Sequence, residues 1–287
     1  MEHRTASSPT DVKHYTTERL RGEFLIQDLF EVGKIKLVYS HIDRIIVGGI
    51  VPVEGEIKLT AGEELRADYF LERREMGVIN IGGAGVITVD GKAFELGYKD
   101  GIYIGRGSKD ISFHSADAKN PAHFYMNSCP AHKEFQTVLI KLEGEADKDT
   151  VIIKDENKVE LGSLEESNHR VINKYILPGQ VESCQLVMGM TALKPGSVWN
   201  TMPCHTHDRR MEVYLYFEMP EDAFVMHYMG EPTETRHIVM RNEEAIISPS
   251  WSIHAGSGSR AYTFIWGMCG ENQAFGDMDE ISNCDLM

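Results

Sequence analysis

The chain has 287 residues, of which 42% are hydrophobic and 25% are charged. These values are ordinary for a globular protein that buries a core. The formal net charge of −15 argues against a nucleic-acid partner, because binding a phosphate backbone requires a basic surface.

Residues 1–23 are polar and mixed in charge, without the basic and then apolar pattern of a secretion signal. No apolar run is long enough to cross a bilayer. The five cysteines have no paired spacing, which is typical of a reduced protein rather than of a disulfide framework. We therefore expect a cytoplasmic protein with no membrane partner.

Short runs of β-branched and aromatic residues recur along the chain between Gly, Asn and Asp. This pattern predicts an all-β sandwich or barrel. The expected strands cover residues 36–39, 45–47, 78–81, 86–89 and 102–104 in the first half, and 212–217, 223–228, 237–240, 245–247 and 262–266 in the second. Helical patterns are scarce, and the candidate helices are 16–30 and 130–141.

The two halves of the sequence also resemble one another. Residues 72–79 echo residues 208–215, and in both halves an Arg-Arg pair leads into an expected strand. Self-similarity of this length predicts two copies of one β module, although common strand residues could coincide by chance. We place the copies at 1–155, an N-terminal barrel, and 156–287, a C-terminal barrel.

A histidine pair distinguishes the second copy from the first. His205 and His207 precede the second Arg-Arg pair, whereas the first pair has no histidines before it. In the same alignment, Ile111 of the first copy stands where the second has His254. We therefore expect metal-binding residues in the C-terminal barrel only.

The two histidines are two residues apart, so on a strand they share a face. Glu212 has the wrong parity to join them on one unbroken strand. It would join them if residues 208–211 turn the chain and Glu212 opens the antiparallel neighbour. His254 follows Pro249 and the end of another expected strand, and we expect it to face the same interior.

Three imidazoles and one carboxylate can hold a divalent metal and leave coordination positions open for a substrate. This set of donors suits Zn, Mn, Fe and Ni about equally. Cys204 lies beside His205, but its strand parity predicts a buried structural thiol that points away from the histidines. Asp208, as the neighbour of His207, is expected to face outward.

Other polar residues close to the histidines have two readings each. Arg209 and Arg210 are either solvated charges on a turn or partners for a substrate carboxylate. His227 and His237 lie on expected strands of the same half, where they could support the ligands without binding the metal. The residues alone assign no group to proton transfer, because parity does not separate Tyr214 from Tyr216.

The order His205, His207, Glu212, Pro249 and His254 resembles the two metal motifs of the cupin superfamily, although Trp251 stands where that pattern usually has glycine. Longer segments resemble one bacterial enzyme family, 5-keto-4-deoxyuronate isomerase, also called 4-deoxy-L-threo-5-hexosulose-uronate ketol-isomerase. These segments are Cys184–Thr191, Met202–Val213, Met229–Pro232, Glu234–His237, Ile247–His254, Tyr262–Met268, Gly270–Gln273 and Asp277–Asp279.

This resemblance implies a duplicated cupin fold with two jelly-roll barrels and assembly into a homohexamer. It also implies one zinc ion per subunit, with His205, His207, Glu212 and His254 as the ligands. The implied reaction converts 5-dehydro-4-deoxy-D-glucuronate, a small deoxyuronate, into 3-deoxy-D-glycero-2,5-hexodiulosonate during breakdown of pectin-derived uronides. A cupin dioxygenase with iron at the same ligands and a non-catalytic sugar-binding or regulatory cupin are the alternatives.

Overall fold

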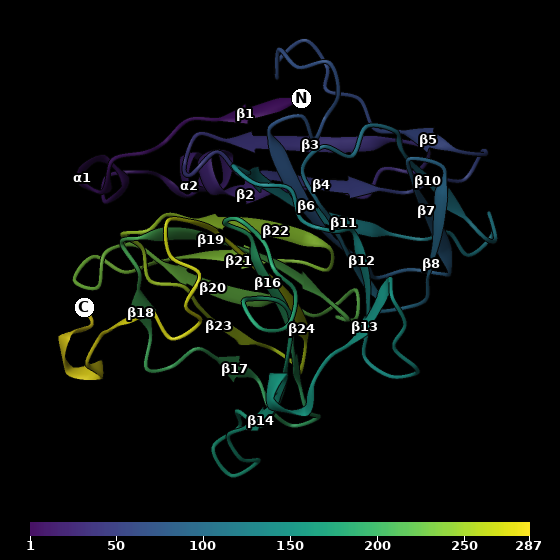
Figure 1. Cartoon of the computed structure of the whole chain (residues 1–287). Helices are drawn as coiled ribbons and strands as arrows, with labels where there is room; N and C mark the ends of the chain where they lie inside the picture. The colour runs from purple at the N-terminus through teal and green to yellow at the C-terminus, as the bar shows by residue number, and fades with distance from the viewer.

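The computed structural model describes all 287 residues, in two β-rich halves (Figure 1). The larger sheet of the first half has eight strands in the order β1-β3-β4-β11-β6-β9-β12-β13. They are β1 (Glu2–Arg4), β3 (Ile35–Ser40), β4 (Ile46–Ile50), β6 (Arg74–Asn80), β9 (Gly101–Ile104), β11 (Phe124–Pro130), β12 (Val138–Lys141) and β13 (Thr150–Ile152). The smaller sheet, in the order β5-β10-β7-β8, contains β5 (Ile57–Lys58), β7 (Gly85–Val89), β8 (Lys92–Leu96) and β10 (Ile111–Ser115).

The larger sheet of the second half has the order β14-β15-β16-β24-β19-β22-β2. Its strands are β2 (Leu25–Ile26), β14 (Lys158–Leu161), β15 (Arg170–Ile176), β16 (Val187–Leu193), β19 (Arg210–Phe217), β22 (Glu244–Ser248) and β24 (Thr263–Gly270). The smaller sheet, in the order β17-β23-β20-β21, contains β17 (Trp199–Asn200), β20 (Val225–Met229), β21 (Arg236–Met240) and β23 (Ala255–Gly258). A separate pair consists of β18 (His205–Thr206) and β25 (Asp279–Glu280).

The two halves repeat one sheet order. In the first half, β3-β4-β11-β6-β9 corresponds to β15-β16-β24-β19-β22 in the second, and the smaller sheets correspond strand for strand. The Arg-Arg echo falls at equivalent places, since β6 starts at Arg74 and β19 at Arg210. The predicted all-β architecture with a duplicated two-sheet barrel is therefore confirmed.

Helices are few and short. The candidate helix over 16–30 is helical only in α2 (Thr17–Phe24), where the Thr16 hydroxyl caps the N-terminus by accepting the N–H of Arg19. The other helical segments are α1 (Pro9–Val12) and the 3₁₀ turns η1 (Asp155–Asn157) and η2 (Asn283–Asp285). The candidate helix over 130–141 is wrong. Pro130 ends β11, and the apolar residues that follow it pair with β9 as strand β12.

No helix in the chain combines the length and the apolar character needed to span a bilayer.

One N-terminal segment leaves the first half and joins the second. Strand β2 pairs antiparallel with β22, with Leu25 opposite Ile246. The side chain of Arg21 donates to the carbonyl oxygen of Val239, at 3.0 Å. The strands of the first half end at β13 and those of the second begin at β14. We therefore propose to keep the division between residues 155 and 156, with α2 and β2 as an arm on the second half (Figure 1).

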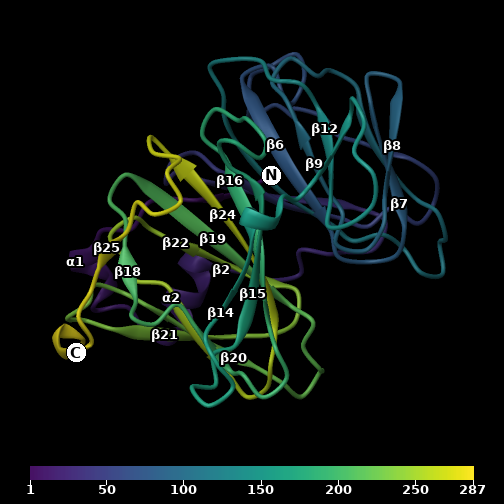
Figure 2. The same ribbon diagram turned by 60° about the horizontal axis from the view of Figure 1, so that its bottom comes forward.

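The larger sheets of the two halves pack against each other through a buried apolar cluster (Figure 2). It joins Ile79 and Tyr103 of the first half to Val213 and Leu215 of the second. Alternation along β19 turns the intervening residues to the other face. That face looks into the second barrel and carries the polar residues of the site.

Candidate metal centre

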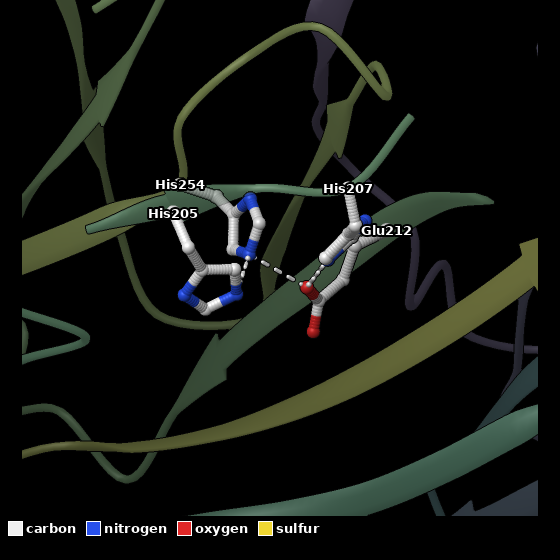
Figure 3. A group of neighbouring side chains, drawn as sticks. All are labelled: His205, His207, Glu212 and His254. Carbon is white, nitrogen blue, oxygen red and sulfur yellow. Dashed lines mark hydrogen bonds and ion pairs between the residues drawn. The ribbon is translucent and has the colours of Figure 1, made fainter. Parts of the chain in front are cut away.

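Four side chains converge in the second barrel (Figure 3). One donor atom from each of His205, His207, Glu212 and His254 lies within 4.8 Å of the others. Oε2 of Glu212 is 2.9 Å from Nε2 of His254 and 3.2 Å from Nε2 of His207. Nε2 of His205 and of His254 are 3.0 Å apart. The expectation that these four side chains come together is therefore met in the structure.

The expected hairpin, in which the strand of the two histidines pairs with the strand of Glu212, is not formed. His205 lies on β18, whose partner is β25, and the turn at Asp208 and Arg209 leads into β19. Strand β19 cannot accept β18 because β22 and β24 already occupy its two edges. His254 directly precedes β23, so the site joins the larger sheet to the smaller one.

Hydrogen bonds outside the cluster orient two of the rings. Nδ1 of His207 lies 2.9 Å from the carbonyl oxygen of Arg210, to which it donates. The proton is thereby assigned to Nδ1, which leaves the lone pair of Nε2 directed into the cluster. Nδ1 of His254 lies 3.4 Å from the carbonyl oxygen of Ser252, a longer contact of the same kind.

The electrostatics favour the metal-binding protonation state at His205 and Glu212 but not at His207. Burial lowers the pKa of His205 to about 3, and the neighbouring His254 adds to this effect. Burial alone would raise the pKa of Glu212, but the charges and hydrogen bonds of His254 and His207 hold it well below its usual range. Burial also opposes charging of His207, yet its hydrogen bond and attraction to Glu212 raise its pKa.

A neutral imidazole and an ionised carboxylate are the forms that bind metal. The cluster supplies three nitrogens and one carboxylate in a nearly dry place, since His207, Glu212 and His254 are at most 5% exposed. These residues fit a divalent cation. Cys204 is buried against Ile253 and Ala255, away from the cluster.

The cluster opens into a cavity of about 220 Å³. Its walls are largely apolar and include Ile172, Phe264 and Trp266. Thr201 and Tyr214 add hydroxyl groups to the lining. A small polar molecule could therefore lie against the metal ligands and be enclosed by aromatic and aliphatic side chains.

The two arginines predicted beside the site hold the C-terminal tail. Nε of Arg209 donates to Asp277 at 3.0 Å and one Nη to Asp279 at 2.7 Å, and Arg209 does not line the cavity. Arg210 does line it and is 1% exposed, but its guanidinium donates to four tail carbonyl groups. Those carbonyls belong to Asn272, Ala274, Phe275 and Asp277. A role for either arginine in substrate binding stays a prediction.

The structure separates the two tyrosines and the two remaining histidines. Tyr214 lines the cavity, whereas the hydroxyl of Tyr216 is held 2.8 Å from Nδ1 of His227, away from the cavity lining. His227 is fully buried and also lies 3.3 Å from the Ser248 hydroxyl. His237 is exposed on β21 and does not touch the ligands.

One lining residue was missed by the sequence reasoning. Arg170, at the start of β15, reaches the same cavity as the metal cluster. It stands in an ordinary polar stretch, 35 residues before His205 and 37 before His207, and no spacing connects it to them. Only the order of strands across the sheet brings it to the site.

Fold and site together define a duplicated cupin with a group of His and Glu side chains able to hold a metal in its second barrel. Residues 24–282 match the KduI/IolB family. The chain belongs to this family.

Relatives with high identity extend over the whole chain. A protein of Lachnoclostridium phytofermentans is 73% identical over 100% of this chain and 99% of its own. A protein of Escherichia coli strain SE11 is 52% identical over 100% of both chains. Both are named 4-deoxy-L-threo-5-hexosulose-uronate ketol-isomerase.

Solved structures support the fold at low sequence identity. An IolB-like protein of Salmonella typhimurium covers 91% of this chain and 97% of its own, with a TM-score of 0.68 and 13% identity. Oxalate decarboxylase of Bacillus subtilis, described with Mn(II) centres, covers 80% and 70%, with a TM-score of 0.52 and 10% identity. The predicted cupin fold is confirmed.

Proposed function

We propose that this protein is a metal-dependent 4-deoxy-L-threo-5-hexosulose-uronate ketol-isomerase. It converts 5-dehydro-4-deoxy-D-glucuronate into 3-deoxy-D-glycero-2,5-hexodiulosonate, a step in breakdown of pectin-derived uronides. The observation that carries the proposal is the four-residue cluster beside a largely apolar cavity, in a chain 73% identical to a relative of that name.

The cluster residues His205, His207, Glu212 and His254 would hold the metal, and we propose zinc. A bound divalent cation supplies Lewis acidity, which polarises a carbonyl group and lowers the pKa of a neighbouring hydroxyl. Zinc suits an isomerisation because it does so without redox side reactions.

The residues of the chain would position the sugar and manage protons. Glu212 is held between two imidazoles, so it serves as a fixed ligand rather than as a mobile base. Tyr214 has its hydroxyl on the cavity side, with Thr201 at 3.5 Å. Tyr214 is therefore placed to exchange a proton with a substrate oxygen, whereas the hydroxyl of Tyr216 is already bonded to His227.

The test combines metal analysis with an assay of the purified protein. We expect one equivalent of metal per chain, isomerisation of the deoxyuronate, loss of turnover on chelation and recovery when zinc is returned. Oxygen consumption distinguishes the isomerase from the alternative, an iron dioxygenase, because an isomerase consumes no oxygen. Oxygen uptake coupled to turnover, or tight uronate binding without any turnover, would overturn the proposed activity.

A further inference from the structure

A second pocket, lined by basic residues, lies at the rim of the first barrel. It has a volume of about 430 Å³ and lies beside the end of β3 and the start of β6. The residues of its lining that carry a charge or an imidazole are Arg44, Arg73, Arg74, His3, His41 and Glu64. The carboxylate of Glu64 is already paired with the amino group of Met1, at 2.9 Å. The pocket is therefore a local concentration of positive charge in a chain whose net charge is −15.

Arg74 is buried in the wall of this pocket without a carboxylate partner. It is 7% exposed, and its hydrogen bonds go to neutral groups. Nε donates to the Ser128 hydroxyl at 3.1 Å, and Nη2 donates to the carbonyl oxygens of Arg44 and Ser128, at 2.6 and 2.7 Å. Nη1 has no partner in the chain and is not enclosed.

The charge of this guanidinium is costly where it lies. Burial lowers the pKa of Arg74, but a guanidinium stays charged near neutral pH. A buried charge without a counter-ion destabilises the fold, because the water that it has lost is not replaced by an opposite charge. An anion in the pocket would supply that charge and accept the free Nη1.

The duplication of the fold shows what meets the equivalent arginine in the second barrel. Arg74 begins β6 as Arg210 begins β19. Four carbonyl groups of the C-terminal tail accept the guanidinium of Arg210. In the first half, the chain that follows β11 leads into β12 instead, and none of its carbonyl groups accepts Arg74. The pocket is thus open at the place that the tail fills in the second half.

Arg44 is held at the pocket by contacts of its own turn. The turn joins β3 to β4, and the carbonyl oxygen of Arg44 accepts Nη2 of Arg74. The neighbouring Asp43 accepts the backbone N–H of Met211 at 2.8 Å, which fixes the turn against the second half. The guanidinium of Arg44 itself is exposed and makes no hydrogen bond or ion pair within the chain. All of its donors are therefore available to a ligand.

The remaining donors surround the same space. Nη2 of Arg73 donates to two carbonyl groups of the loop before β6, at 2.6 and 3.0 Å, and Nη1 lies 3.9 Å from the carboxylate of Glu72. The ring centroids of His3 and His41 are 6.0 Å apart. Each imidazole can donate at least one N–H.

We propose that this pocket binds a phosphate group, either as the free ion or as the monoester of a small metabolite. Guanidinium groups bind phosphate oxygens through paired, charge-assisted hydrogen bonds. Three guanidinium groups and one carboxylate that is already paired suit the nearly double charge of phosphate better than the single charge of a carboxylate. The site lies in the first barrel, apart from the metal cluster, so it goes beyond the proposed isomerase and does not depend on it.

The first test is calorimetric titration of the metal-loaded protein with inorganic phosphate. We expect one equivalent to bind per chain, and Arg44→Gln to weaken binding roughly 10-fold through the loss of charge-assisted hydrogen bonds. Arg44 is exposed, so this variant should keep the melting temperature of the wild type in the absence of phosphate. Arg260→Gln is the matched control, because Arg260 is exposed and paired with Asp222 outside the pocket, and it should bind as the wild type does.

Two results of this titration would overturn the site. One is the absence of phosphate binding at millimolar concentration. The other is binding that Arg44→Gln leaves unchanged and that chelation of the metal abolishes, since phosphate would then lie at the metal cluster. Phosphate should also raise the melting temperature of the wild type more than that of Arg44→Gln, because a ligand of the folded state stabilises it in proportion to its affinity.

The second test compares ligands of different chemistry at the same ionic strength. Titrations with a hexose phosphate and with succinate are set beside the titration with inorganic phosphate. Tighter binding of the hexose phosphate identifies a phosphorylated metabolite as the ligand, and equal or weaker binding identifies the free ion. Tighter binding of succinate than of either phosphate would overturn the assignment to a phosphate group.

Discussion

Glu212 occupies the middle of the cluster and accepts contacts from two rings through the same oxygen, Oε2. Its other oxygen is free for a cation or for a ligand. Since the carboxylate is 5% exposed, water cannot replace either ring as a partner. The cluster therefore depends on all of its members, and removal of one leaves buried polar groups without partners.

Loss of a ligand should abolish metal binding. We expect His254→Ala and Glu212→Gln each to weaken zinc affinity by more than the roughly 10- to 100-fold that follows loss of an outer hydrogen-bond partner. Metal content after dialysis against a chelator, measured by mass spectrometry, checks this. His237→Ala is the control, because His237 is exposed on β21. Retention of full metal content in both ligand variants would contradict the proposed centre.

The two tyrosines should respond differently to removal of their hydroxyl groups. Tyr214→Phe removes a hydroxyl from the cavity wall, and we expect kcat to fall roughly 100-fold, as for loss of a proton-transfer group. Tyr216→Phe leaves Nδ1 of buried His227 without its partner, so we expect about 1–3 kcal/mol lower stability with a smaller change in kcat. Steady-state kinetics and urea unfolding of both variants provide the comparison. The reverse ranking of kcat would remove Tyr214 from the mechanism.

For single residues, the sequence predicted the four members of the cluster but not their surroundings. These four residues form an ordered motif that their order and spacing along the chain can reveal. The partners of Arg209 lie 68 and 70 residues further along the chain, where no periodicity connects them. Without knowledge of how the tail folds back, an arginine beside a metal site looks like a substrate ligand.

Among the elements, β19 shows how one strand serves two purposes. All eight of its residues are buried. Glu212, Tyr214 and Tyr216 face the barrel interior, while Val213 and Leu215 pack against the first half. The sequence predicted this strand over 212–217 because apolar and aromatic residues dominate there. It did not predict the start at Arg210, a charged residue that is buried only because tail carbonyl groups accept its donors.

Strand β6, the counterpart of β19 in the first half, carries a buried carboxylate that joins the two halves. Glu75 is fully buried and accepts the backbone N–H groups of Cys184, Gln185 and Leu186, each at 2.7 or 2.8 Å. Its Oε2 also accepts the hydroxyl of Tyr103 at 2.8 Å. The segment before β16 is therefore fixed in place by a residue of the other half.

Glu75→Gln should destabilise the protein by about 2–4 kcal/mol. The amide NH₂ cannot accept, so two buried donors would lose their acceptor and face another donor. Urea unfolding followed by circular dichroism measures the change. Glu95→Gln on β8 provides a matched exposed control, for which we expect a change within about 0.5 kcal/mol. Equal stability of the two variants would show that Glu75 does not hold the halves together.

The misassigned helix over 130–141 shows where element prediction fails. Val138 to Ile140 pair with β9, and that partner lies more than thirty residues earlier in the chain. A short apolar run fits either a helix or a buried strand. Tertiary pairing decides between them, and one sequence carries no local sign of it.

Over the whole molecule, the two barrels share one sheet order, but only the second holds the cluster of His and Glu side chains. The interior of the first barrel is filled by an apolar cluster that includes Ile111, Phe113 and Phe124. Ile111 is 2% exposed at the start of β10, the counterpart of β23, which His254 precedes. The halves thus differ in what fills their interiors rather than in their strand order.

The hexamer implied by the family resemblance is a prediction about the assembled molecule. We expect sedimentation velocity to give a particle six times the 32.3 kDa mass of the chain. Oligomers of soluble proteins close by symmetry, so the particle should be discrete and its mass unchanged on moderate dilution. A single species at the mass of one or two chains would refute it.

The arm formed by α2 and β2 docks on residues that are synthesised much later than the arm itself. Its partners, Val239 and Glu244, are 218 and 217 residues later in the chain. During synthesis the arm leaves the ribosome 218 and 217 residues before these partners. Contacts of such long separation slow folding and leave apolar surface uncovered meanwhile. The second barrel can thus close its outer edge only after β21 and β22 have been synthesised.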